Sequence, residues 1–128
     1  MSQNTHRCSP SKINRQLPRG GAGLHALDVA VEFAGTVQTL PLSRGLSHLR
    51  DHLVRAADNT ALRLSEASGR TLGNRYQHLE GAYAENQEVQ SDLLLISGRG
   101  IEVPESVLRT ADRLGGMIFG LLRAEARR

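Results

Sequence analysis

The chain has 128 residues and a formal net charge of +3, and only 3% of its residues are aromatic, with no tryptophan. A chain of this length makes one domain with a single core, which here must be built from leucine, valine, isoleucine and alanine. An internal disulfide is excluded because Cys8 is the only cysteine, and this fits a reducing compartment. No apolar run approaches the roughly 18 to 20 residues of a membrane span. We therefore expect a cytoplasmic protein that does not enter a membrane.

Residues 1–23 form a basic segment of low apolar content. They contain Arg7, Lys12, Arg15 and Arg19 and no acidic residue, whereas residues 24–128 hold 12 arginines against 13 aspartates and glutamates. Such a segment cannot repay the entropic cost of ordering, so we expect a disordered basic tail before a domain over residues 24–128. A solvated leader without a role fits this composition as well as a functional arm does.

Four segments after this tail have the period of an amphipathic helix: residues 24–40, 43–68, 75–97 and 104–126. The second carries the longest apolar stripe, which comprises Leu46, Leu49, Leu53, Ala56, Thr60, Leu64 and Ala67. The inward face of the third comprises Leu79, Ala82, Val89, Leu93 and Ile96, together with Tyr76, Tyr83, Asn86 and Gln90. The first segment looks apolar on more than one side, because Val29 and Phe33 fall outside its main stripe.

The breaks between these segments are short and carry the usual signals. Pro41 ends the first helix, and Ser43 is a candidate N-cap for the second. Gly98 is a candidate C-terminal cap for the third, and Pro104 suits the first position of the fourth. Short connections force consecutive helices to run antiparallel, so the sequence predicts an all-α, up-down-up-down four-helix bundle.

Polar residues and glycines interrupt two of the apolar faces. Asn86 and Gln90 are either a polar pair that fixes packing register, which we favour, or groups that contact a ligand. Gly115, Gly116 and Gly120 each cost about 0.8–1 kcal/mol relative to alanine inside a helix. We therefore expect another backbone to approach there, either within the bundle or across a subunit boundary.

Signs of catalysis or metal binding are weak. His48 and His52 stand four residues apart, a spacing that can hold a metal ion, but no third ligand is evident. The sequence has no Glu-x-x-His pair, no phosphate-binding glycine loop and no nucleophile motif. We therefore predict no catalytic, cofactor or metal site, and a protein that is not an enzyme.

The up-down-up-down topology brings basic residues to one end of the bundle. The N-terminal tail, the connection between the second and third helices and the C-terminus meet there. We predict a nucleic-acid-binding site at this basic end, formed by Arg70, Arg75, Arg123, Arg127 and Arg128. The opposite end balances Arg44 and Arg99 against two glutamates. A solvated end without a ligand is the alternative.

Residues 55–70, RAADNTALRLSEASGR, resemble the signature of a family of small four-helix-bundle proteins. The family comprises proteins encoded in intervening sequences of bacterial large-subunit ribosomal RNA genes and accessory variability determinant proteins of diversity-generating retroelements. Its pattern is approximately R-A-A-x-S-I-P-x-N-I-A-E-G-x-G-R. The matching positions are Arg55, Ala56, Ala57, Leu64, Glu66, Gly69 and Arg70, with Leu79, Ala82 and Glu88 in the next helix. Ala61 stands where the family has proline, and Arg63 where it has asparagine.

The resemblance implies an assembly and a class of partner. Members form homopentameric barrels, and the retroelement proteins bind a reverse transcriptase and nucleic acid. It therefore implies a ring-forming, non-catalytic binding module for RNA or a nucleoprotein. A protein-protein interaction adaptor that binds no nucleic acid is the second hypothesis, and an enzyme or metal-binding bundle is the third.

Overall fold

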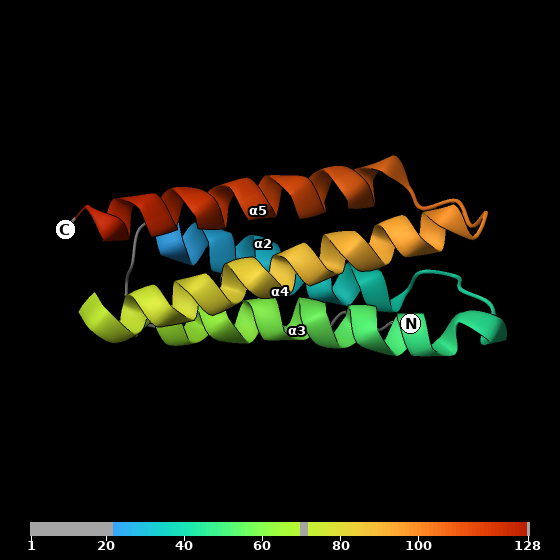
Figure 1. Cartoon of the computed structure of the whole chain (residues 1–128), viewed down its shortest axis with the longest axis horizontal. Helices are drawn as coiled ribbons and strands as arrows, with labels where there is room; N and C mark the ends of the chain where they lie inside the picture. The colour runs from blue at the N-terminus through green and yellow to red at the C-terminus, as the bar shows by residue number, and fades with distance from the viewer. Residues whose placement is uncertain (1–21, 70–71, 128) are drawn as a thin grey trace, which may run out of the picture.

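A computed structural model describes residues 22–69 and 72–127, which form four long antiparallel helices (Figure 1). These are α2 (Ala22–Gln38), α3 (Ser47–Ser68), α4 (Leu72–Gly98) and α5 (Glu105–Ala126). Each helix packs on the next in the chain, and α5 packs back on α2. This arrangement confirms the predicted all-α four-helix bundle. The predicted basic tail, as far as residue 21, lies outside the described residues.

Two helices begin earlier than the sequence predicts. α2 starts at Ala22 and α4 at Leu72, so Gly73 and Asn74, expected in a loop, lie in the first turn of α4. The backbone N–H groups of a first turn have no partner within the helix, so weak helix formers cost little there. Packing against neighbouring helices then decides where the helix begins.

The connections also differ in detail. Ser43 precedes a short 3₁₀ turn, η2 (Arg44–Leu46), and its side chain makes no capping hydrogen bond. Pro104 is the N-cap of α5 rather than its first helical residue. The turn after α4 uses Gly100, with φ of 85°, rather than Gly98. The N–H groups of Gly100 and Ile101 donate to the carbonyls of Ser97 and Ile96, at 3.0 and 3.4 Å, which is a Schellman arrangement.

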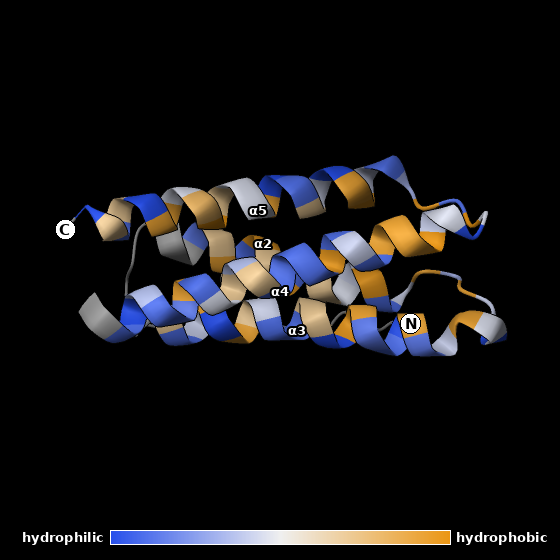
Figure 2. Ribbon diagram, in the orientation of Figure 1, coloured by the Kyte–Doolittle hydropathy of each residue, from blue (hydrophilic) through white to orange (hydrophobic). Residues whose placement is uncertain are grey.

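The predicted apolar stripe of α3 is buried along its whole length. Hydrophobic and hydrophilic residues alternate along each helix in Figure 2, because one side faces the core and the other faces solvent. The described residues form two apolar core clusters. One is centred on Leu53, Leu93 and Ile96, and the other on Leu64, Leu79 and Ile118. Thr60 and Asn86 lie at the boundary between them, and both are buried.

Two predictions about side-chain direction need correction. Val29 and Phe33 of α2 are buried and line the junction with α5, so they give no free second apolar face. Tyr76 was predicted to point inward but is 36% exposed, and Tyr83 is only half-buried. The reason is the rotation of α4, which presents Ala82 rather than the tyrosines to the core.

Candidate functional site

The candidate site is the end of the bundle where α2 begins, α3 gives way to α4 and α5 ends, on the left of Figure 1. Of the five arginines predicted to act there, Arg75, Arg123 and Arg127 are described. Arg70 and Arg128 lie outside the described residues. The three described arginines have different surroundings, and these decide which of them can contact a ligand.

The side chain of Arg75 makes contacts that join neighbouring helices. Its Nε donates to Glu125 Oε1 of α5 at 3.2 Å, and its Nη1 donates to the carbonyl of Ala67 in α3 at 3.1 Å. The Glu125 side chain is only 5% exposed, so this ion pair is shielded from solvent. Arg75 thus joins three helices and caps the C-terminal end of α3. Its guanidinium is therefore a poor candidate for binding an external phosphate.

Arg50 performs a similar task at the opposite end of the bundle. Its two terminal nitrogens donate to the carbonyls of Gln38 and Leu40, at 3.2 and 2.6 Å, just where α2 ends. Arg50 lies outside the predicted apolar stripe of α3, so the helical period alone did not indicate these contacts. A usable signal was present, because Arg50 and Arg75 each lie within the first turn of a helix that follows a tight connection.

Arg123 and Arg127, in contrast, are exposed at the end of α5. The Arg123 guanidinium carbon lies over the ring of Phe119, 5.9 Å from its centroid. That ring in turn lies 5.9 Å from the ring of Tyr83 in α4, with an interplanar angle of 45°. A cation over an aromatic face is held by the ring quadrupole, so Arg123 keeps a defined position while its charge remains accessible.

Asn86 and Gln90, the polar residues on the inward side of α4, bond to each other and to α5. Asn86 Nδ2 and Gln90 Nε2 both donate to the carbonyl of Ala111 in α5, at 3.2 and 3.4 Å. Gln90 Nε2 also donates to Asn86 Oδ1 at 2.7 Å. A Cβ atom at Gly115 would lie 2.6 Å from Asn86 Oδ1, so glycine makes room for the pair. This arrangement supports the packing role and leaves Asn86 no surface for a ligand.

The three glycines of α5 therefore have different roles. Side chains, rather than the backbone that the sequence predicted, approach Gly115. Gly116 and Gly120 are exposed, and a Cβ at either would meet nothing within 4 Å. Within one chain, the space around these two glycines is open.

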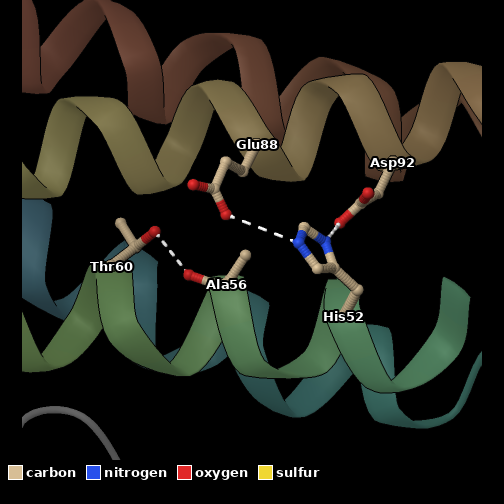
Figure 3. A network of polar contacts seen from close by, with 5 residues as sticks. All are labelled: His52, Ala56, Thr60, Glu88 and Asp92. Atoms are coloured by element: carbon tan, nitrogen blue, oxygen red, sulfur yellow. Dashed lines mark hydrogen bonds and ion pairs between the residues drawn. The ribbon is translucent and has the colours of Figure 1, made fainter. Parts of the chain in front are cut away.

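His52 lies in a polar network between α3 and α4 (Figure 3). Its Nδ1 is 2.6 Å from Asp92 Oδ2, and its Nε2 is 3.7 Å from Glu88 Oε1. The Asp92 side chain is 5% exposed and the His52 side chain 46% exposed, so a buried carboxylate holds a half-exposed ring. The hydrogen bond and the negative charge of Asp92 raise the pKa of His52 above its usual value. The network therefore favours the imidazolium, which links the two helices.

The surroundings of His48 and His52 differ. His48 is exposed one turn before His52. Among residues 22–69 and 72–127 there is no group of three or more His, Cys, Asp or Glu side chains that could hold a metal ion. Sequence spacing did not reveal the partner of His52, because Asp92 lies forty residues further along the chain.

A second polar cluster follows the same α3–α4 junction toward the basic end. His78 Nδ1 lies 3.1 Å from Glu66 Oε1 and 3.4 Å from Arg63 Nη1. Burial, with a smaller contribution from the charge of Glu88, raises the pKa of Glu85 in the adjoining turn. These polar contacts join α3 to α4 at this level of the bundle.

An open apolar groove lies between α2 and α3. Its volume is about 560 Å³, and it is lined mainly by Leu27, Val31, Ala34, Ala61 and Leu62. Leu62 is largely exposed. Three polar residues, Gln38, Asp58 and Ser65, also line the groove.

Comparisons of the chain with protein-family models, with curated proteins and with solved structures find no match. Within the part of the chain that the structure describes, no helix is both long enough and apolar enough to cross a lipid bilayer.

Proposed function

We propose that this protein is a non-catalytic, oligomeric, cytoplasmic binding module that contacts RNA or a nucleoprotein partner through its basic end. The observation that carries the proposal is the exposure of Arg123, in the last turn of α5, and of Arg127, its C-cap residue. Helix α2 begins and α3 ends at this end of the bundle, and in the sequence α2 follows a segment with four cations and no acid, while Arg70 follows α3. Arginine matches phosphate geometry well, so exposed arginines beside a basic segment favour a polyanionic partner.

The structure changes which residues the proposal uses. Arg75 is held by Glu125 and the Ala67 carbonyl, so it supports the site without contacting phosphate. In this proposal, the phosphate contacts are made by Arg70, Arg123, Arg127 and Arg128. Each phosphate that they neutralise releases condensed counterion, which makes the affinity depend steeply on salt.

Gel-shift titrations with structured and single-stranded RNA at two salt concentrations test this proposal. We expect a log–log salt slope of roughly 0.7 to 0.9 per phosphate contacted. Replacing Arg123 and Arg127 by alanine should weaken binding to all sequences similarly, because phosphate contacts carry no base information. The matched control replaces Arg44 and Arg99, which are exposed at the far end. Absence of binding at low salt, or equal effects of the two pairs, would exclude the basic end as the site.

The proposed assembly, a homopentamer, rests on the resemblance to the intervening-sequence and retroelement accessory proteins. The exposed Gly116 and Gly120 and the apolar α2–α3 groove are surfaces that a neighbouring subunit could cover. Light scattering at micromolar concentration is the measurement, and a mass near the 13.9 kDa of one chain would exclude any oligomer.

The second candidate function is a protein-protein interaction adaptor without nucleic-acid binding. The α2–α3 groove with its exposed Leu62 favours it. A helix of a protein partner can bury an apolar face in such a groove. This hypothesis takes the place of the first if RNA does not bind at low salt.

A further inference from the structure

The aromatic residues of this chain are few and unevenly placed. There are two tyrosines, two phenylalanines and no tryptophan. Phe33 is in the core, and Tyr83 of α4 is half-buried and packs against the core cluster around Leu79 and Ile118. Phe119 is 48% exposed, and Tyr76 is 36% exposed. Packing in the core therefore explains Phe33 and the buried part of Tyr83, but it does not explain the exposed rings of Tyr76 and Phe119.

We call the side chains of Tyr76, Tyr83 and Phe119 the aromatic strip. The strip begins at the junction of α4 and α5 and extends toward the basic end of the bundle. The Tyr83 and Phe119 rings are 5.9 Å apart across the α4–α5 junction, where the two helices lie side by side in Figure 1. Tyr76 precedes Tyr83 by seven residues, which places it about 10.5 Å further along the same side of α4. Arg123 lies over Phe119, and Arg127 follows one turn later. The two exposed arginines thus follow Phe119 along α5, beside the strip.

We propose that the aromatic strip stacks unpaired bases of single-stranded RNA, whose phosphates lie along Arg123 and Arg127. The inference rests on the proposed function and names the form of RNA that the basic end prefers. Every base has an aromatic face, so exposed rings beside a basic track bind single strands with little sequence preference. Bases in a duplex are already stacked and are unavailable to such rings.

Charge favours RNA as the occupant. The Arg123 guanidinium lies over the Phe119 ring and is exposed, so a strand whose bases stack on the rings finds a cation beside them for its phosphates. One acid opposes the RNA: Glu80 is exposed on α4, four residues after Tyr76 and three before Tyr83. This residue provides a variant with a predicted gain in affinity.

Tyrosine emission gives a direct readout, because the chain has no tryptophan and both tyrosines belong to the strip. The probes are a 12-nucleotide oligouridylate, an abasic 12-mer with the same phosphates, and a 12-base-pair RNA duplex. We expect the oligouridylate to quench the emission and to bind about five- to one-hundred-fold more tightly than the abasic strand. The abasic strand and the duplex should bind through phosphates alone and leave the emission nearly unchanged.

Two variants separate stacking from charge. Phe119→Leu keeps apolar bulk on a half-exposed position and should lower affinity for oligouridylate about five- to one-hundred-fold, with no change for the abasic strand. Glu80→Gln, the matched surface control, should raise the affinity for both strands a few-fold by removing repulsion. Circular dichroism confirms that each variant keeps its helices.

The possible results discriminate between the two proposals. Equal affinity for oligouridylate and the abasic strand, or no effect of Phe119→Leu on either, overturns stacking while the phosphate-binding function stands. No RNA binding at low salt overturns both. A fall in oligomer mass caused by Phe119→Leu would show that the strip is a subunit interface and would also overturn the inference.

Discussion

Substituting Gly115 by alanine tests the polar pair in the centre of the bundle. The added Cβ would lie 2.6 Å from Asn86 Oδ1 and 3.0 Å from Gln90 Nε2. Asn86 is fully buried and short, so it cannot swing away without leaving the carbonyl of Ala111. The expected result is a less stable protein, although alanine is normally the better helix former.

The expected change in the free energy of unfolding is the sum of two opposing contributions. Alanine gains about 0.8–1 kcal/mol over glycine inside a helix. Losing the Asn86 hydrogen bonds costs about 1 kcal/mol each, and a buried amide without a partner costs about 1–3 kcal/mol. We expect a net loss of about 1–3 kcal/mol for Gly115→Ala. Gly116→Ala and Gly120→Ala meet open space, so each should gain about 1 kcal/mol.

The assay is urea unfolding followed by far-ultraviolet circular dichroism for all three variants. A difference of about 2–4 kcal/mol separates Gly115→Ala from Gly116→Ala, which corresponds to roughly 8–16 °C in melting temperature for a domain of this size. The double variant Gly115→Ala with Asn86→Ala should be more stable than additivity predicts, because the clash disappears. If Gly115→Ala stabilises the protein as much as Gly116→Ala, the proposed need for glycine at this position is wrong.

The remaining predictions concern the ion pairs. Asp92 raises the pKa of His52 in the folded protein. The His52–Asp92 interaction therefore stabilises the fold fully below the unfolded pKa of about 6.5, and this stabilisation is lost as the pH rises through the higher pKa of the folded protein. His52→Gln should therefore cost more unfolding free energy at pH 6 than at pH 8 in urea titrations. The difference should be less than about 1 kcal/mol, because the ring is half-exposed. Arg75→Ala should destabilise the bundle by roughly 3 kcal/mol, because it removes the shielded contact to Glu125. Arg75→Lys should recover part of this loss. If Arg75→Ala leaves the melting temperature unchanged, the Arg75 side chain does not hold the helices together and is available to a ligand.

Most of the fold could be predicted from local sequence. Helical period needs only residues three and four apart, so the stripe from Leu46 to Ala67 specified α3 and its buried face before any neighbour was known. Pro41 and the glycines near residue 100 marked the connections between helices. Because these connections are short, consecutive helices must pack antiparallel. The number, order and direction of the helices followed from these local signals.

The roles of individual polar residues depended on tertiary structure. Arg75 and Arg123 look alike in the sequence, but only Arg75 meets a carbonyl at the end of another helix and a buried carboxylate. Gly115 and Gly116 are adjacent, yet the 100° turn between successive residues of a helix puts one against Asn86 and the other in solvent. A periodic pattern fixes which residues share a face. It leaves open the rotation and level at which that face meets its neighbours, and the packed bundle sets both.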